Sequence, residues 1–206
     1  MHVPLRGIRV HLSGSIPEDA TEEQSKSISL FVERFAQAVL RDGGTLIHGS
    51  HPSFDMPLKA AAARFVAAGG ARDALILVRA QKFATTSEQF HEIEAQRQYS
   101  TVQIVPAVFG DINRSLVPMR EWMAEHCDVV VAIGGRHWDV NRSLAGVPEE
   151  LEETLARAKP GFVLGAFGGA IAGYLQTHNT VFPRLRNGLT IDDNRALASS
   201  TDIGYL

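Results

Sequence analysis

Short apolar segments alternate with helix-like segments along most of the chain. The apolar segments cover residues 7–12, 45–49, 74–78, 102–108, 129–133 and 161–167. Between them, residues 25–40 place Ile28, Phe31, Val32, Phe35 and Val39 at the spacing of one helix face. Further helices are predicted at residues 57–68, 118–126, 148–158 and 168–175, whereas the last thirty residues are expected to be mostly loop. Gly43-Gly44 and Gly69-Gly70 stand where two of these helices should end.

Alternation of strands and helices predicts right-handed crossovers and a largely parallel sheet. The fold class expected is therefore α/β, a Rossmann-like doubly wound and mostly parallel sheet of about six or seven strands with helices on both faces. No repeat, low-complexity tract or linker interrupts the pattern, so residues 1–206 are expected to form a single domain.

Bulk composition excludes several classes of function. With 45% hydrophobic residues the chain can form a core, and its formal net charge of −3 does not favour nucleic acid as a partner. Cys127 is the single cysteine, which rules out an internal disulfide. No apolar run of about 18 residues suggests a membrane helix, and no secretory signal is visible. We expect a cytoplasmic protein with no membrane partner.

Glycine and small polar residues follow the predicted strands. In a doubly wound sheet, ligands bind at the carboxyl ends of strands, and glycine there exposes backbone N–H groups. The candidate ligand-binding residues at these positions are Ser13, Gly14, Ser15, Gly49, Ser50, His51, Gly134, Gly135, Gly168 and Gly169. The chain has neither GxGxxG after its first strand nor GxxxxGK[ST]. This argues against an ordinary dinucleotide dehydrogenase and against a P-loop NTPase.

Arg120 and two glutamates, Glu149 and Glu150, complete the candidate site. Arg120 is expected on the first turn of the helix at 118–126, where it either pairs with Glu121 or Glu125 in solvent or grips a phosphate. Glu149 and Glu150 begin the next helix, where helix-dipole electrostatics alone would favour them. Placed at the sheet edge, an arginine and a glutamate would form a nucleotide clamp, with the glutamate accepting hydrogen bonds from ribose hydroxyls.

The same residues resemble a known superfamily. "MREWM", "DVVVAIGG" and "GVPEEL" resemble the SLOG superfamily, whose members include nucleotide phosphoribohydrolases of the LOG type and DprA-like proteins. By resemblance, Arg120, Gly134-Gly135, Gly146 and Glu150 match the motif, whereas Val147 replaces the usual threonine and residues 136–145 are an extra segment. "SGSIP", "HGSHPSF" and "FGGAIAGYL" look closer to the sensor-type SLOG domains of bacterial anti-phage systems such as Thoeris.

Two functions follow from this resemblance. The first is binding or sensing of a nucleotide-derived ligand, of the ADP-ribose or cyclic ADP-ribose type, in a bacterial defence or signalling system. The second is cleavage of the base–ribose bond by an N-glycosidase or phosphoribohydrolase, with Glu150 and Arg120 as its catalytic residues. A small interaction domain without a ligand is a third alternative. The replaced threonine and the altered loop favour sensing.

The sequence also bears on oligomerisation and on metal or cofactor binding. A homodimer or higher homo-oligomer is implied by the resemblance, with Trp122, Met123 and Val181-Phe182 as the apolar residues that hint at it. Trp138 either stacks on a base or covers an apolar surface. His11, His48 and His51 are candidates for a metal site, but histidines at sheet edges are more often hydrogen-bonded side chains. We therefore expect no metal and no cofactor.

Overall fold

A computed structural model describes residues 4–108, 112–136 and 145–202. Within these residues, six strands form one sheet in the order β4-β3-β2-β1-β5-β6, and every neighbouring pair is parallel. The strands are β1 (Arg9–Ser15), β2 (Thr45–His48), β3 (Leu75–Ala80), β4 (Thr101–Val105), β5 (Val129–Gly134) and β6 (Gly161–Leu164). The fold is therefore an α/β Rossmann-like sheet, as the alternating pattern predicts.

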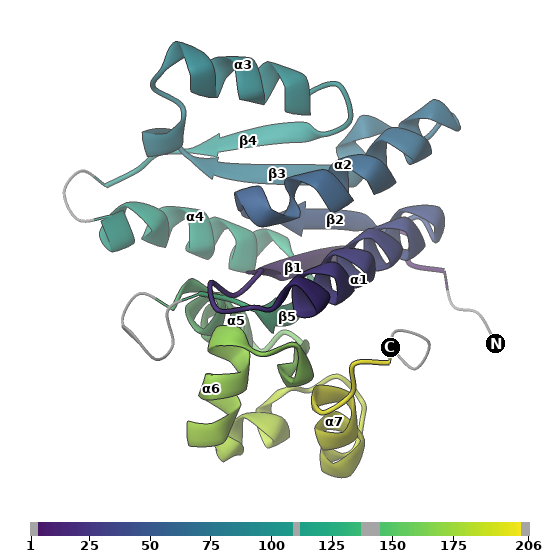
Figure 1. Cartoon of the computed structure of the whole chain (residues 1–206), viewed down its shortest axis with the longest axis vertical. Coiled ribbons are helices and arrows are strands. Elements are labelled where there is room, and N and C mark those ends of the chain that lie inside the picture. Colours follow the sequence, from purple (N-terminus) through teal and green to yellow (C-terminus); the bar gives the residue numbers. More distant parts are fainter. Residues whose placement is uncertain (1–3, 109–111, 137–144, 203–206) are drawn as a thin grey trace.

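Helices cover both faces of this sheet (Figure 1). The described helices are α1 (Glu22–Arg41), α2 (Pro52–Ala67), α3 (Ser87–Gln96), α4 (Ile112–His126), α5 (Gly146–Ala156), α6 (Gly169–Thr177) and α7 (Ile191–Ala198). Short 3-10 segments lie at η1 (Arg72–Ala74), η2 (Gln81–Phe83), η4 (Gly165–Phe167) and η5 (Asn179–Arg184). None of the described helices is long and apolar enough to cross a membrane.

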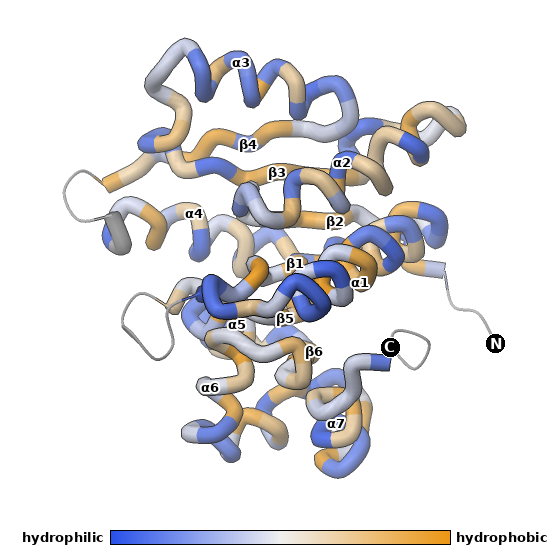
Figure 2. Tube along the Cα trace, viewed as in Figure 1, coloured by the Kyte–Doolittle hydropathy of each residue, from blue (hydrophilic) through white to orange (hydrophobic). Residues whose placement is uncertain are grey.

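Side chains of alternating strand residues divide the core between the two faces. Leu12, Leu46 and Leu77 pack with α1 and α2 on one face. Val78, Ala80 and Ile47 pack with α4 on the other, and a separate cluster joins β5 and β6 to α5 and α6. Figure 2 shows β2 and β4 as largely apolar and α3, which lies against β4, as largely hydrophilic.

Strand order reverses between β1 and β5. The chain moves from β1 through β2 and β3 to β4, then returns to the opposite side of β1 to form β5. Such a reversal opens a crevice at the carboxyl ends of the two strands, because the helices that follow them lie on opposite faces. The polar residues selected from the sequence lie around this reversal.

Several element boundaries differ from the sequence-based expectation. Ser13, Gly14 and Ser15 are part of β1 and do not form a loop after it. Helix α2 begins at Pro52 because His51 caps it, accepting a hydrogen bond from the Ser53 N–H at 3.3 Å. A proline at the first helical position suits such a start.

Two further differences from the sequence-based expectation concern helices α4 and α7. Helix α4 begins at Ile112, so Pro118 lies inside it and Arg120 is not on its first turn. Burial of Met119 and Met123 against the sheet stabilises the longer helix despite the proline. Helix α7 lies in the region predicted to be mostly loop, and a capping box between Thr190 and Asp193 begins it.

Candidate functional site

A cleft of about 870 Å³ runs along the carboxyl edge of the sheet, from the β1–β5 reversal to the end of β3. The predicted site residues that line it are Gly14, Ser15, Gly49, Ser50, His51, Arg120 and Glu150. Arg79, Phe83, Asp55, Gln89, Glu92 and Arg136 line it as well. Arg120 and Glu150 therefore share one cavity, as the clamp hypothesis requires.

Arg120 reaches this cleft from the middle of α4. Its side chain is 6% exposed and forms an ion pair with Glu149, whose side chain is 45% exposed. A Cβ atom added at Gly146 would lie 2.9 Å from Arg120 Nη2, so the absence of a side chain there lets the guanidinium lie over the first turn of α5. Arg120 Nε is buried and finds no hydrogen-bond partner within residues 4–108, 112–136 and 145–202. The alternative of a solvated Arg120 paired with Glu121 or Glu125 is wrong.

Glu150 points toward the sheet from the start of α5. Ser13 Oγ donates a hydrogen bond of 2.6 Å to Glu150 Oε2, and His11 Nε2 lies 3.3 Å from the same oxygen. Both partners come from β1, where residues two apart share a face. Burial alone would raise the pKa of Glu150, but His11, Ser13 and Arg120 lower it below its usual value. The cleft thus holds an ionised carboxylate.

His11 is the counter-ion of this carboxylate. The imidazole is fully buried. Burial would lower its pKa, yet the side chains of Cys127 and Glu150 raise the pKa of His11 to about 9. His11 and Glu150 therefore form a buried imidazolium–carboxylate pair at neutral pH, and Ser13 fixes the orientation of the carboxylate.

This pair makes stability depend on pH. The folded pKa of His11, about 9, lies above its model value of 6.5, so its contribution is complete below pH 6.5 and lost as pH rises toward 9. Glu150 contributes above pH 4.5 and loses that contribution in acid, because its folded pKa is lowered. We expect the free energy of unfolding to fall by about 3 kcal/mol between pH 6.5 and 9. Urea unfolding at a series of pH values measures this decline, which His11→Gln should remove; an equal decline in that variant would contradict the assignment.

His48 stays neutral beside this charged pair. Burial lowers the pKa of His48 to about 4. Its Nδ1 lies 2.8 Å from the Leu12 carbonyl oxygen, and its Nε2 accepts the His51 N–H at 3.3 Å. A neutral imidazole with its proton on Nδ1 satisfies both contacts. His48 therefore ties the end of β2 to β1 and orients the loop that follows.

Ser50 is the strained residue of that loop. It has a φ of 52°, in the left-handed region that residues other than glycine rarely adopt. Its hydroxyl is buried without a hydrogen-bond partner among the described residues, and the residue lines the cleft. Strained backbone and unsatisfied polar atoms are common at ligand sites. Ser50 thus offers a preformed donor or acceptor to a ligand.

The paired glycines lie beside the cleft without lining it. A Cβ atom at Gly134 would lie 2.3 Å from the Ser15 carbonyl oxygen, and one at Gly169 would lie 2.4 Å from the Gly135 carbonyl oxygen. The Ala170 N–H donates to the Gly135 oxygen at 3.0 Å. Gly134, Gly135 and Gly169 therefore let β1, β5 and α6 approach closely, and Gly168 caps α6. Their predicted contact with a ligand stays a prediction.

The remaining sequence hypotheses concern residues elsewhere. Met123 and Val181 are fully buried in the chain's own core, and Trp122 stacks on His126. These residues give little support to a dimer surface, and oligomerisation stays a prediction from the resemblance. Trp138 lies outside the described residues. Among residues 4–108, 112–136 and 145–202, no group of three His, Cys, Asp or Glu side chains could hold a metal ion.

The roles of Arg79 and His11 are not predicted from the sequence. The apolar pattern ends the third strand at residue 78, so Arg79 is not among the predicted site residues, whereas β3 continues through Arg79 to Ala80. A charged residue directly after an apolar strand segment was the signal that pointed to it. His11 was considered only as a metal ligand; its role as counter-ion of Glu150 depends on α5, which no local pattern places against β1.

Comparison with known proteins agrees with the fold described above. A doubly wound parallel sheet with a polar cleft at its switch point defines a Rossmann-like α/β protein. The sequence model of SLOG cluster2 matches residues 73–187, and the chain belongs to that SLOG family. No curated protein sequence matches the chain.

One solved structure is similar in fold, and a second one matches with a TM-score below 0.5. The X-ray structure of TM1055, a Northeast Structural Genomics Consortium target, has a TM-score of 0.52 and 16% sequence identity, over 82% of this chain and 81% of that chain. The molybdenum cofactor carrier protein of Chlamydomonas reinhardtii has a TM-score of 0.47 and 17% identity, over 93% of this chain and 95% of that chain. At these identities the likeness concerns the fold alone.

Proposed function

We propose that the cleft binds a nucleotide-derived ligand, with a phosphate at Arg120 and ribose hydroxyls at Glu150. The observation that carries this proposal is that a buried guanidinium and an ionised carboxylate line one cleft at the β1–β5 reversal. Membership of the SLOG superfamily is consistent with nucleotide-related binding or cleavage.

Phosphate binding is supported by the surroundings of Arg120. Guanidinium groups bind phosphate oxygens through two parallel hydrogen bonds. The partner of Arg120, Glu149, is half-exposed, so a phosphate can take its place while the glutamate turns to solvent. The eleven-residue helix α5 also begins here, without a side-chain cap, and Gly146 and Val147 line the cleft. Its first N–H groups and its dipole favour an anion at the same position.

Ribose binding is supported by the surroundings of Glu150. Ser13 and His11 both contact Oε2, so the second carboxylate oxygen can accept hydrogen bonds from a ligand. The low pKa of Glu150 keeps this acceptor ionised throughout the neutral range. An ionised carboxylate accepts hydrogen bonds from a vicinal diol, which is what the Rossmann-type acidic residue does.

Within this ligand class we favour an ADP-ribose or cyclic ADP-ribose species, sensed in a bacterial defence or signalling system. The volume of about 870 Å³ lies toward the upper end of the range for small-molecule sites, so the cleft has room for more than one nucleoside unit. The defence context rests on the resemblance of "SGSIP", "HGSHPSF" and "FGGAIAGYL" to sensor-type SLOG domains.

Cleavage of the base–ribose bond is the second candidate, and one observation favours it. The ionised Glu150 would stabilise the positive charge that develops at the ribose C1 during glycosidic cleavage. The same ionisation makes Glu150 a poor proton donor to a departing base, since a general acid needs a pKa near the working pH. Binding is therefore the function that the site supports better.

A ligand panel tests the proposal. The protein is mixed with AMP, NAD or ADP-ribose, and thermal unfolding and the release of free base are measured in the same samples. We expect ADP-ribose to raise the melting temperature without base release, because a ligand that binds only the folded state stabilises it. Release of free base by the wild type that Glu150→Ala abolishes would establish the hydrolase instead. If none of the three nucleotides raises the melting temperature, the proposed nucleotide binding is wrong.

A further inference from the structure

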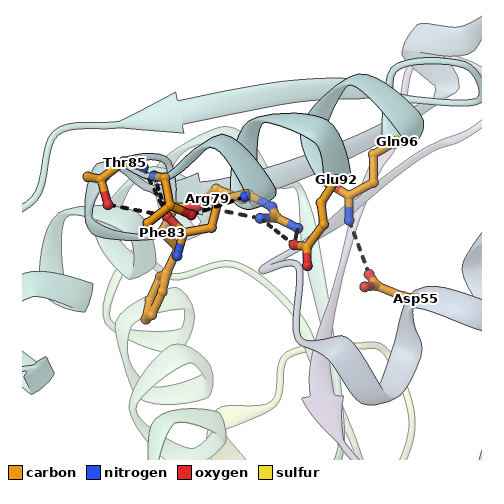
Figure 3. Close-up of polar contacts among 8 residues, drawn as sticks. Asp55, Arg79, Phe83, Thr85, Glu92 and Gln96 are labelled. Atoms are coloured by element: carbon orange, nitrogen blue, oxygen red, sulfur yellow. Dashed lines mark hydrogen bonds and ion pairs between the residues drawn. The ribbon is translucent and has the colours of Figure 1, made fainter.

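Arg79 is a second buried arginine of the same cleft. It comes from β3 and its side chain is 8% exposed. Nη1 and Nη2 donate to Glu92 Oε2 at 3.3 and 3.2 Å, and Nη1 donates to the Phe83 carbonyl oxygen at 3.4 Å. Figure 3 shows the guanidinium between Phe83 and Glu92, with Asp55 and Gln96 beyond the glutamate. Arg79 Nε is buried and has no hydrogen-bond partner in the part of the chain that the structure describes.

These contacts do not explain why an arginine is buried at this position. All three are longer than the 2.7–2.9 Å typical of charge-assisted hydrogen bonds. Glu92, its carboxylate partner among the described residues, is 56% exposed, so water weakens its attraction to the cation. A buried guanidinium that lacks full compensation lowers stability compared with an apolar side chain. Ligand binding by the Arg79 guanidinium would offset the stability that its burial costs.

Arg79 and Arg120 have the same arrangement. Each guanidinium is almost fully buried, and among the described residues each has an unpartnered Nε and one half-exposed glutamate as its ion-pair partner: Glu92 for Arg79 and Glu149 for Arg120. A half-exposed carboxylate can turn into solvent and be replaced by another anion. In both places the glutamate thus holds the position that an anionic group of a ligand would take.

The two arginines lie at separate parts of the cleft. Arg79 comes from β3, whereas Arg120 comes from α4, which packs on the sheet through Met119 and Met123. Arg79 contacts α3, and Leu77, two residues before it, packs with the α1–α2 face, whereas Arg120 and Glu150 come from α4 and α5 on the other face. A ligand that reached both arginines would lie across the edge of the sheet and carry two separated anionic groups.

We propose that Arg79 binds a second anionic group of the ligand in place of Glu92, so that the cleft selects nucleotides with two separated phosphates or comparable anions. This inference rests on the proposed nucleotide site at Arg120 and Glu150 and deepens it. The ligand class is a nucleoside bisphosphate or a linear dinucleotide, in contrast to a mononucleotide with one phosphate, and in this respect the inference departs from ADP-ribose, whose two phosphates are joined directly.

Asp55 is the other carboxyl group that faces this position. Gln96 Nε2 donates to Asp55 Oδ1 at 3.3 Å. Burial raises the pKa of Asp55, and the charge of Glu92 raises it further against the opposing effect of Arg79. Protonation of Asp55 is therefore easier than for an exposed aspartate, which reduces the repulsion that an incoming anion meets. Glu88, also at this end, is exposed.

Calorimetric titration tests the inference with AMP, adenosine 3′,5′-bisphosphate and the linear dinucleotide pApA. The readout is the ratio of the AMP Kd to the Kd of the better two-anion probe. We expect this ratio to be about tenfold or more in the wild-type protein and to fall to near one in Arg79→Leu, because each charge-assisted contact to a phosphate contributes about a tenfold change or more. Glu92→Gln should increase the ratio, since it removes the competing carboxylate. The melting temperature of ligand-free Arg79→Leu should equal or exceed that of the wild type.

The outcomes separate this inference from the proposed function. If AMP binds but the ratio is near one in the wild type, or is unchanged in Arg79→Leu, the second anion subsite is wrong and the nucleotide site stands. If none of the three probes binds the wild type, the second anion subsite is wrong, and the panel with AMP, NAD and ADP-ribose decides the nucleotide site separately. Should Arg79→Leu not fold, Glu92→Gln decides: a larger ratio supports the inference, and an unchanged or smaller ratio overturns it.

Discussion

Replacing Arg120 with leucine is expected to weaken binding of a nucleotide-derived ligand by at least about thirtyfold, which corresponds to 2–5 kcal/mol for the loss of a buried charge partner. The reason is that Arg120 is the buried cation beside the first turn of α5, and the helix dipole alone provides much less binding free energy. Calorimetric titration with the ligand that stabilises the wild type most measures the change.

The matched control for this substitution is Arg114→Leu. Arg114 lies on the same helix and is exposed, so the two variants lose the same charge and gain the same apolar side chain. We expect Arg114→Leu to bind like the wild type. Ligand-free Arg120→Leu should unfold at nearly the wild-type temperature, because the ion pair with half-exposed Glu149 contributes little. Equal affinities for the two variants would show that Arg120 does not contact the ligand.

Gly169→Ala is expected to destabilise the protein by about 3 kcal/mol or more, through overpacking and backbone strain together. Gly169 has a φ of 69°, which alanine adopts only with strain, and an added Cβ would lie 2.4 Å from the Gly135 carbonyl oxygen. That oxygen belongs to backbone and accepts the Ala170 N–H, so it cannot move away cheaply. Urea unfolding measures the difference in free energy.

Gly188→Ala is the matched control for the backbone contribution. Gly188 also has a positive φ, of 82°, but an added Cβ there would meet nothing within 4 Å. We expect it to cost only the strain of the left-handed conformation, about 1 kcal/mol. A similar loss in the two variants would mean that the close approach of β5 and α6 contributes no stability of its own.

Much of the fold was predictable because its signals are local. Apolar residues at helix spacing, such as Ile28, Phe31 and Val32, and glycine pairs at helix ends define element types within a few residues of sequence. Parallel pairing then follows from the alternation of strands and helices. Boundaries were less accurate where packing overrides local preference: Pro118 lies inside α4 because the helix is anchored by Met119 and Met123.

The candidate site was predictable only in its residue types. The motif resemblance selected Arg120 and Glu150, and strand ends selected Ser50 and His51, all of which line the cleft. The same strand-end rule selected Gly168, which caps α6, and Gly169, which packs against the backbone of Gly134 and Gly135 at the end of β5. A glycine beside a strand end serves close packing or ligand approach, and the sequence pattern is the same in both cases.

The amino-acid sequence by itself determined the order of strands and helices, the parallel sheet and the edge at which polar residues gather, since these follow from periodicity and turn-forming residues. Only the tertiary structure decided that His11 and Ser13 of β1 meet Glu150 of α5, and that Arg79 and Arg120 share a cleft. Ionisation of Glu150 and incomplete pairing of the two arginines depend on burial and on neighbours distant in sequence. Such contacts are set by how the layers pack, which no local stretch of residues encodes.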